Sequence, residues 1–566
     1  MLEEIKKIIK GDVLIDEETL DYYSRDASLF EIRPTIVIFP KDSNDIQELV
    51  KWVSQNKDKY PGISITARAA GTCMSGGSIN DSIILDLTKY MGGVIDIKEE
   101  PDSLIHGHVI SGYATVLPGT FYRDFDKETR KFNLIMPSYS ASREICAVGG
   151  MVSNNAGGEK SIQYGKTEDY IRELKVVFHD GYEYTINKIS RKELLAKITI
   201  PGFEGEMYKE LFRIINENIK TITNAKPDVS KNSAGYYLWN IWDKENDTFD
   251  LCRLIVGSQG TLGIITEIKF NLVKTKKFST LAVVFLKDMQ NLGNIVNTAL
   301  TSGPESIESY DDNTLKVAIK FFGDFLKKKK FWGMLKFMIS FLPELFMTIS
   351  GGMPKMVLLI EFAGNDYDEI QNKAKYVAKE IKDKYKALTH VTHSEAEEQK
   401  YWDVRHESFN LLRKHVKGRH TAPFIDDFIV KPEFLPEFLP KLDSILAKYN
   451  LTYTIAGHPG DGNFHIIPLM YLTDPKTREV ILSLSDEVYD LVLEYNGSIT
   501  AEHNDGIIRS PYLEKQYGST VVMLFKEVKE LFDPKYIFNP HKKVGVTKDD
   551  ISKYLSHGDY GQATKK

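Results

Sequence analysis

The stretch RAAGTCMSGGS, Arg68 to Ser78, joins two apolar runs that we predict to be strands, ISIT before it and SIILDL after it. Its small residues permit a close approach of the backbone, and its successive N–H groups can wrap a pyrophosphate without a following lysine. The spacing matches neither the GxxxxGKS/T of a P-loop nor the GxGxxG of a Rossmann turn. Taken alone, the loop is also compatible with an ordinary tight turn.

Around this loop, strands and helices alternate from about Ile32 onward. PTIVIFP predicts a strand, and DSNDIQELVKWVSQN predicts a helix that begins at the polar caps Asp42 and Ser43. LKVVFHDGYEY and LCRLIVGS predict further strands, with a turn signal at HDG. The pattern indicates an α+β or α/β domain.

The pattern changes near Thr275. STLAVVFLKDMQNLGNIVNTAL and MVLLIEFAGNDYDEIQNKAKYVAKEI each predict a strand followed by a helix. Such units build an antiparallel sheet with helices on one side. We therefore predict an N-terminal helical segment at residues 1–31, a first domain at 32–275, a second domain at 276–546 and a polar tail at 547–566 that frays.

The composition narrows the classes of function. Lys and Arg number 73 against 79 Asp and Glu, a net charge of -6 that gives no reason to expect nucleic acid as a partner. Cys73, Cys146 and Cys252 form no CxxC pair, which argues against an iron–sulfur cluster, a zinc knuckle or a disulfide scaffold. The N-terminus mixes acids and bases, unlike a signal peptide. We expect a cytoplasmic protein.

The segment KKKKFWGMLKFMISFLPELFMTIS, residues 327–350, is the one stretch that suggests a membrane. Lys336, Pro343 and Glu344 interrupt it, so it is a poor spanning helix and a better candidate for lying in the membrane interface. A basic surface turn followed by a buried helix fits the same pattern. Peripheral contact at the inner face of the membrane therefore stays open.

Three further stretches are rich in glycine: VGGMVSNNAGG at 148–158, YGKT at 164–167 and VGSQGTLGIIT at 256–266. Each places small and hydrogen-bonding residues where the chain can approach another group closely. Together with the first loop they are hard to explain as turns alone.

The stretch TIAGHPGDGNFH, Thr454 to His465, carries two histidines around a proline and glycines that exclude a helix. A turn must therefore bring His458 and His465 together, which suits a divalent metal that takes a third ligand from elsewhere. Glu502 in ITAEHNDG is a candidate third ligand, and Glu502 and His503 can face one site if the strand ends there. Histidines satisfied by the backbone of a hairpin are the alternative.

In this order the motifs resemble the FAD-binding domain of the vanillyl-alcohol oxidase / p-cresol methylhydroxylase (PCMH) superfamily. They resemble more closely the branch that holds D-lactate dehydrogenase, the flavin subunit of glycolate oxidase and D-2-hydroxyglutarate dehydrogenase. The match runs from about residue 32 to 546. It implies an α+β fold: a PCMH-type FAD-binding domain of two α+β subdomains, followed by a cap domain with an antiparallel sheet covered by helices.

The resemblance implies that FAD is held by the glycine-rich stretches. The chain departs from the family at Ala69, Ala70 and Cys73, where relatives have glycine, and the first loop has no histidine for covalent attachment. We therefore expect dissociable FAD. The implied FAD-binding residues are Arg68, Gly71, Thr72, Ser75, Gly76, Gly77, Gly149, Gly150, Ser153, Asn155, Gly158, Gly165, Gly257, Gly260, Thr261 and Ile265.

The resemblance also implies the chemistry. His458, His465 and Glu502 match the metal ligands of the family, for zinc or manganese, and His503 matches its catalytic base. Arg405 matches the arginine that grips the substrate carboxylate, although the sequence around it is that of a solvated helix charge. The implied reaction is oxidation of a D-2-hydroxy acid, with hydride transfer to the flavin.

Further departures concern the loops around this site. Relatives commonly read EHG followed by a further glycine where this chain has EHNDG, and NPGK where it has NPHK with His541. Tyr236 in PDVSKNSAGYYL either lies on the substrate side or packs. The family positions that grip a second carboxylate do not match, which favours a monocarboxylate such as lactate over a dicarboxylate.

The sequence says less about which acceptor takes the electrons from the reduced flavin. Longer relatives carry clustered cysteines in an iron–sulfur domain, so we expect a separate iron–sulfur subunit, a quinone or a soluble carrier as acceptor. A transferase of the alkyldihydroxyacetonephosphate synthase type is the alternative, and His458, His465 and Glu502 argue against it. A protein that binds FAD without turnover is disfavoured because the catalytic positions are all present.

Overall fold

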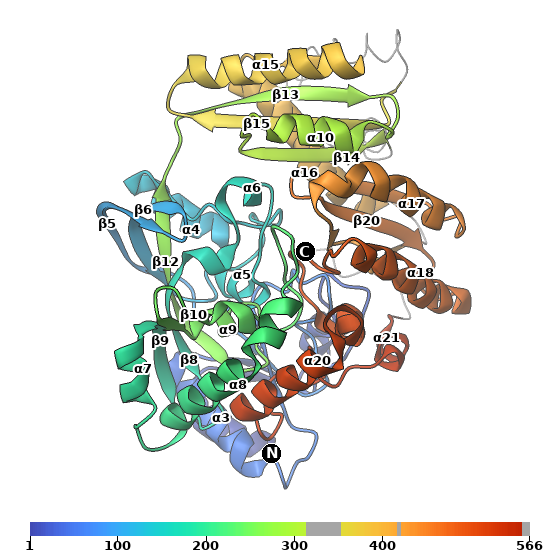
Figure 1. Cartoon of the computed structure of the whole chain (residues 1–566). Coiled ribbons are helices and arrows are strands. Elements are labelled where there is room, and N and C mark those ends of the chain that lie inside the picture. Colours follow the sequence, from blue (N-terminus) through green and yellow to red (C-terminus); the bar gives the residue numbers. More distant parts are fainter. Residues whose placement is uncertain (313–352, 416–419, 557–566) are drawn as a thin grey trace.

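The structure is a computed structural model that describes residues 1–312, 353–415 and 420–556. The segment 327–350, with its predicted membrane contact, lies outside the described residues. The described residues contain three β-sheets. Two lie in the first domain, and one lies in the second domain, which we call the cap (Figure 1). None of the described helices combines the length and the apolar character that crossing a bilayer requires.

The first sheet has the order β1-β2-β4-β3, and the glycine-rich loop Arg68 to Ser78 leaves the end of β3. The pairs β2–β4 and β3–β4 are parallel, whereas β1 joins β2 in antiparallel fashion. The N-terminal segment, predicted as helical only, thus contributes a strand to this sheet. The elements are α1 (Leu2–Ile8), β1 (Asp12–Leu14), α2 (Glu17–Tyr23), β2 (Ile36–Phe39), α3 (Ser43–Asn56), β3 (Ile65–Arg68) and β4 (Ile83–Asp86).

The second sheet has the order β10-β11-β9-β8-β12-β6-β5, with β7 paired to β12. The stretch LCRLIVGS, predicted as a strand, contains the helix α9 instead, because a short buried apolar run has no periodicity that separates the two states. The strands are β5 (Val94–Ile105), β6 (His108–Val116), β7 (Leu134–Ile135), β8 (Ile171–Val177), β9 (Glu183–Ser190), β10 (Trp242–Asp243), β11 (Thr248–Asp250) and β12 (Ile264–Lys274). The helices are α4 (Tyr122–Thr129), α5 (Val148–Asn154), α6 (Ser161–Tyr164), α7 (Arg191–Lys197), α8 (Phe203–Ala225) and α9 (Cys252–Ile255).

The cap contains the third sheet, in the order β16-β13-β15-β14-β19-β20-β17 with β18 paired to β20. Every pair in it is antiparallel, as predicted for this part of the chain. Its strands are β13 (Phe278–Leu286), β14 (Ser306–Asp311), β15 (Met356–Gly364), β16 (Leu388–Val391), β17 (His420–Thr421), β18 (Phe428–Ile429), β19 (Tyr453–His458) and β20 (Asn463–Met470). The helices from here onward are α10 (Leu292–Leu300), α15 (Tyr367–Tyr385), α16 (Glu395–His415), α17 (Leu435–Ala447), α18 (Pro475–Glu494), α19 (Gly506–Arg509), α20 (Leu513–Phe532) and α21 (Lys548–Tyr554).

The cap lies over the first domain, with α15 on its far side and α6 of the first domain packed beneath β14 (Figure 1). After the cap sheet the chain returns to the first domain through α20. The segment predicted as a fraying polar tail begins with α21, which a capping box between Thr547 and Asp550 starts and whose Ile551 is buried.

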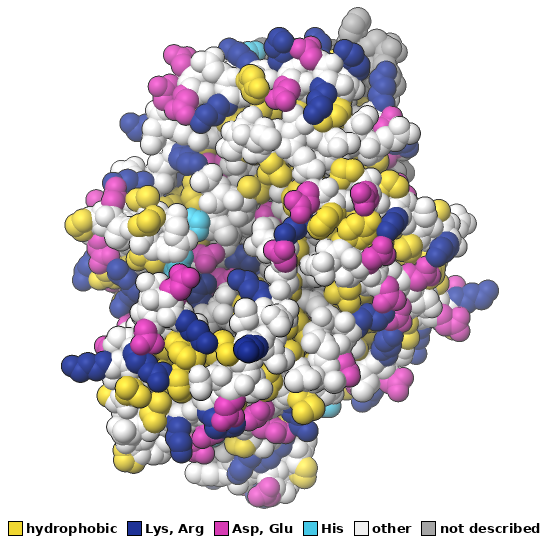
Figure 2. All heavy atoms as spheres, in the orientation of Figure 1, with side chains coloured by type: hydrophobic (Ala, Val, Ile, Leu, Met, Phe, Trp, Pro, Cys, Tyr) yellow, Lys and Arg dark blue, Asp and Glu magenta, His cyan; other side chains and the backbone are white. Residues whose placement is uncertain are grey.

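The visible surface carries both signs of charge. Figure 2 shows basic and acidic side chains interspersed over the face that it presents. The composition has the same balance, with 73 Lys and Arg against 79 Asp and Glu.

His541 occupies a backbone conformation that suits glycine. Its φ is 61°, in the left-handed region, and its side chain is exposed. A residue with a Cβ pays a steric cost there of about 1–2 kcal/mol. His541 therefore holds a conformation that the glycine expected from the NPGK motif would adopt without this cost.

We expect His541→Gly to raise the free energy of unfolding by about 0.5–1 kcal/mol, since the relief of strain exceeds the added chain entropy of glycine. The midpoint of urea unfolding measures the change. His393→Gly, at an exposed histidine outside the left-handed region, should lower the midpoint. A lower midpoint for both variants would contradict the assignment of strain.

Candidate active site

The hairpin of β19 and β20 places His458 and His465 on one face of the cap sheet. Ala456 lies opposite His465 in the register, and His458 lies two residues beyond Ala456. Side chains two apart on a strand share a face, so the two imidazoles are diagonal neighbours. Their ring centroids are 5.2 Å apart.

The hydrogen bonds of the two imidazoles fix which ring nitrogen is free. His465 Nδ1 donates to the backbone carbonyl of Asp426, and His458 Nδ1 donates to the carboxylate of Glu308. In the neutral form of each ring, Nε2 is therefore the atom that carries the free lone pair. His458 Nε2 is buried, has no hydrogen-bond partner among the described residues and lies 3.5 Å from a carboxylate oxygen of Glu502.

Glu502 and His503 face the same site because the chain bends around a carboxylate. Asp427 Oδ2 accepts from the backbone amides of both residues, at 2.9 and 2.7 Å. The bend replaces the regular strand in which adjacent side chains would diverge. His503 Nδ1 lies 2.9 Å from Asp426 Oδ2, and its ring stacks on that of His465 with centroids 4.9 Å apart.

Burial and neighbouring charges set the protonation of these groups. Burial lowers the pKa of His465, and the neighbouring His503 and His458 lower it further, to about 3. Burial also opposes the charged form of His458 and of His503, but adjacent carboxylates outweigh it and raise the pKa of each to about 9. His465 is therefore neutral near pH 7, as a metal ligand must be.

Buried lysine and arginine side chains compensate part of the negative charge. Lys231 Nζ, fully buried, contacts Glu502 and lies 3.2 Å from Asp461 Oδ2. Burial raises the pKa of Glu502, but the charges of Lys231 and His458 outweigh it and hold that pKa well below its usual range. Glu502 is thus a carboxylate at neutral pH.

The donor set fits a divalent cation. Five carboxylates surround the histidines, and three cationic side chains contact those carboxylates. The two negative charges that remain can be balanced either by protonated His458 and His503 or by a divalent cation. The carboxylates are Glu308, Asp426, Asp427, Asp461 and Glu502, and the cations are Lys231, Arg405 and Arg509. Ligand atoms of Asp427, His465, Glu502 and His503 lie within 4.8 Å of one another. Imidazole and carboxylate ligands of this kind suit zinc or manganese.

Arg405 lies on α16 beside this cluster. Its Nη2 is 3.3 Å from Glu308 Oε2, and its side chain is 10% exposed. The side chain is therefore not the solvated helix charge that its local sequence suggests. Glu308 contacts both Arg405 and His458.

The four glycine-rich stretches meet in space, and the amide of Thr167 in YGKT donates to the carbonyl of Ala156 at 3.0 Å. The backbone amides of Gly257 and Gln259 donate to the carbonyls of Val152 and Ser153, both at 2.9 Å. The side chain of Asn539 donates to the carbonyls of Gly77 and Gln259 at 2.8 Å and so joins the first loop to the last. The predicted residues Gly76, Gly77, Gly149, Gly150, Ser153, Asn155, Gly257 and Gly260 all lie on these converging stretches.

The first loop fits a pyrophosphate. No backbone hydrogen bond within the described residues uses the amides of residues 71–74, so successive N–H groups are available to an anion. Gly71 and Gly76 have φ values of 67° and 80°, which the curve of the loop requires. Arg68 lies at the start of the loop, with its guanidinium over the ring of Tyr23.

Several predicted cofactor residues make contacts with the protein itself. Thr261 bonds to Tyr236 at 2.6 Å, and Tyr236 is buried against Phe525, so this tyrosine packs and does not face the substrate side. Ile265 lies in β12 opposite Val176. The remaining positions are Thr72 and Ser75 in the first loop, Gly158 beside Tyr139, and Gly165 at the end of α6.

Sequence reasoning missed the residues that orient the predicted ones. Asp426 and Asp427 stand in IDDFIV and Glu308 in SIESYD, where nothing local distinguishes them from ordinary strand and turn residues. Lys231 and Asp461 were present in quoted motifs but had no assigned role. The adjacent carboxylates of Asp426 and Asp427, directly before an apolar strand, were the one feature of the sequence that could have indicated these residues.

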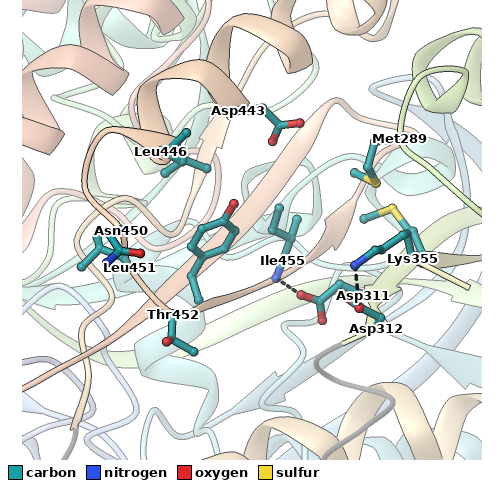
Figure 3. Close-up of a pocket in the computed structure, with 13 residues that line it drawn as sticks. Met289, Asp311, Asp312, Lys355, Asp443, Leu446, Asn450, Leu451, Thr452 and Ile455 are labelled. Carbon is teal, nitrogen blue, oxygen red and sulfur yellow. Dashed lines mark hydrogen bonds and ion pairs between the residues drawn. The ribbon is translucent and has the colours of Figure 1, made fainter. Parts of the chain in front are cut away.

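A cavity of about 540 Å³ on the cap is not this site (Figure 3). It is lined in part by Asp311, Lys355, Asp443 and Tyr453. Asp311 lies three residues beyond Glu308 on β14, so its side chain points to the opposite face of the sheet. The cavity also concentrates carboxylates, which repel an anionic substrate.

The comparisons with known proteins agree with this architecture. Residues 34–187 match the model of the FAD binding domain, and residues 275–543 match that of the C-terminal domain of FAD linked oxidases. The chain belongs to the FAD-linked oxidases. The predicted family resemblance and the FAD-binding domain are thereby confirmed.

Curated relatives of this FAD-linked oxidase include proteins of two lengths. It is 25% identical to D-2-hydroxyglutarate dehydrogenase of Haemophilus influenzae, over 97% of this chain and 52% of that protein. It is 24% identical to D-lactate dehydrogenase of Anaerostipes hadrus, over 96% of both chains. The chain thus spans about half the length of the first relative and nearly all of the second.

Solved structures share the fold at lower identity. The TM-score is 0.64 to 4-ethylphenol oxidase from Gulosibacter chungangensis, at 15% identity over 97% of both chains. It is 0.62 to p-cresol methylhydroxylase, at 16% identity over 97% of this chain and 96% of that one. It is also 0.62 to alkyldihydroxyacetonephosphate synthase, at 14% identity over 95% of this chain and 84% of that one. The predicted PCMH-type fold class is confirmed.

We expect Lys231→Met to lower the free energy of unfolding by about 3–5 kcal/mol, because it leaves the carboxylates of Glu502 and Asp461 buried without their cation. Urea unfolding followed by tryptophan fluorescence measures this. Lys448→Met removes an exposed ion pair with Glu487 and should cost less than about 1 kcal/mol. Equal, small effects of the two variants would contradict the role given to Lys231.

Proposed function

We propose that this FAD-linked oxidase oxidises a small D-2-hydroxy acid, of the D-lactate type, to the 2-oxo acid. One observation carries the proposal: His503, bonded through Nδ1 to Asp426, stacks on His465, which lies beside His458 and Glu502. The names of the relatives, D-lactate dehydrogenase and D-2-hydroxyglutarate dehydrogenase, support the same substrate class.

The residues present fit the two groups that the chemistry needs. The converging glycine stretches would hold FAD, and His458, His465 and Glu502 would hold a zinc or manganese ion. When bound, FAD supplies a hydride acceptor at flavin N5, and the cation lowers the pKa of the substrate hydroxyl and fixes its orientation.

His503 acts as the base. The neutral form of His503 is the active one: its Nδ1–H is directed at the Asp426 carboxylate, so Nε2 takes the proton of the 2-hydroxyl group while C2 loses its hydride. Asp426 holds the ring in this tautomer and stabilises the imidazolium that forms. The two amide bonds to Asp427 keep the backbone of His503 in place during the transfer.

Arg405 anchors the substrate carboxylate. A guanidinium offers several N–H donors in one plane, which Glu308 and a substrate carboxylate would share. Because the family positions for a second carboxylate do not match, we propose a monocarboxylate such as D-lactate. The reduced flavin would pass its electrons to a separate iron–sulfur subunit, a quinone or a soluble carrier, in the cytoplasm or at the inner face of the membrane.

A transferase of the alkyldihydroxyacetonephosphate synthase type remains the second candidate, since a solved structure of that protein has the same fold. Such an enzyme carries out no net electron transfer. The histidine and carboxylate cluster suited to a cation favours the oxidation instead.

Anaerobic mixing of the FAD-loaded protein with D-lactate tests the proposal. We expect the flavin absorbance near 450 nm to bleach, with D-2-hydroxyglutarate less effective and L-lactate inactive. An intact flavin band with every 2-hydroxy acid would refute the oxidation and leave the transferase or a protein without turnover.

The base is tested separately. His503→Ala should retain FAD and lower the rate of flavin reduction by about 10²–10⁴-fold, as expected for loss of a general base. His390→Ala, at a histidine on β16 that pairs with Glu397, is the matched control and should reduce at the wild-type rate. Unchanged reduction in His503→Ala would remove His503 from this role.

A further inference from the structure

Glu308 lies at the centre of the cap sheet, on β14 between β15 and β19. In the register, Tyr310 faces Ala456 and Ser309 faces Gly457, so Glu308 comes next to His458. Its side chain is 1% exposed. An unpaired carboxylate at such a position is costly, so its partners determine how the region is held.

Each oxygen of this carboxylate has a different partner. Oε1 accepts from Nδ1 of His458, and Oε2 lies 3.3 Å from Nη2 of Arg405. Under the proposed function these partners have separate tasks, one at the metal and one at the substrate carboxylate. They nevertheless share a single negative charge.

We propose that Glu308 is a positioning residue that couples the candidate metal ligand His458 to the candidate substrate anchor Arg405. This inference rests on the function proposed above. The carboxylate holds His458 in the tautomer that presents Nε2, and it raises the basicity of that nitrogen. The same carboxylate orients the guanidinium of Arg405.

The charges involved determine how substrate binding at Arg405 affects metal binding at His458. A substrate carboxylate competes with Glu308 for the N–H groups of Arg405, so its binding leaves more of the Glu308 charge to His458. His458 then becomes a stronger ligand. By linkage, a bound cation increases the affinity for the substrate anion by the same factor.

Zinc affinity measures the first half of the coupling without any turnover. Zn²⁺ is titrated into the full-length, FAD-loaded protein in competition with a chromophoric chelator and in the absence of substrate. Glu308→Gln should weaken Zn²⁺ binding about 10–100-fold, because the amide holds the imidazole less strongly. The matched control is Glu398→Gln, at a buried glutamate of the same domain that accepts from Ser279, and it should leave the affinity unchanged.

A double-mutant cycle separates coupling from a local structural effect. Arg405→Met frees Glu308 for His458, so it should strengthen Zn²⁺ binding by about threefold or more in the wild-type background and leave it unchanged in the Glu308→Gln background. Retained FAD absorbance shows that each variant is folded. Glu308→Asp, which keeps the charge but shortens its reach, replaces Glu308→Gln in the cycle if the latter does not fold.

The inference is overturned if Arg405→Met leaves the Zn²⁺ affinity of the wild type unchanged or weakens it, if it changes both backgrounds equally, or if the wild type binds no Zn²⁺. Flavin reduction by D-lactate is measured on the same wild-type preparation. If D-lactate bleaches the flavin but the mutant cycle shows no coupling between Glu308 and Arg405, the inference is wrong and the proposed function stands. If the cycle shows coupling but D-lactate does not bleach the flavin, the proposed oxidation is wrong and the link between Glu308 and Arg405 stands.

Discussion

The carboxylate of Asp427 is the constraint on which the rest of the site depends. It is buried directly before β18 and accepts from the amides of Glu502 and His503, while its other oxygen accepts from the side chain of Asn463 at the start of β20. Burial raises its pKa, but His503 and Arg509 outweigh this and lower that pKa to about 2. A charged acceptor at neutral pH thus ties the Glu502 bend to the hairpin that carries His458 and His465.

The site also depends on both domains. Ser75, in the first glycine-rich loop, donates to the carbonyl of His503 at 3.1 Å, and its own carbonyl accepts from the amide of Ile507 at 2.8 Å. Lys231, from the first domain, neutralises Glu502 of the second. The loop suited to FAD and the histidine suited to proton transfer are therefore held against each other, as a hydride transfer to flavin requires.

Much of this arrangement was predictable from the sequence. The glycine-rich stretches, the turn between His458 and His465, and the antiparallel cap all follow from local patterns of glycine, proline and apolar residues. The orienting carboxylates were not predictable in this way. Glu308 contacts a histidine 150 residues away and Asp426 one 77 residues away, and no local pattern records such a pairing. The stretch LCRLIVGS was wrongly predicted because its burial hides the difference between helix and strand.

The glycine-to-histidine change at His541 shows the limit of reasoning from a motif. The backbone keeps the left-handed geometry, so the return of the chain to the first domain is unaffected by the residue type. The two changes in the EHNDG loop behave similarly, since Asn504 has a φ of 64° and its side chain donates to the carbonyls of Asn154 and Gly257. At Asn504, side-chain hydrogen bonds thus hold the left-handed backbone that the family's glycine would adopt.

The central claim is that the two imidazoles and the Glu502 carboxylate form a cation site beside His503. Crystals of the FAD-loaded protein grown with Mn²⁺, measured for anomalous scattering, test it most directly. The account predicts an anomalous peak about 2.0–2.3 Å from Nε2 of His458, Nε2 of His465 and an oxygen of Glu502. Fully occupied flavin with Glu502 still bonded to Lys231, and no peak between the histidines, would contradict it.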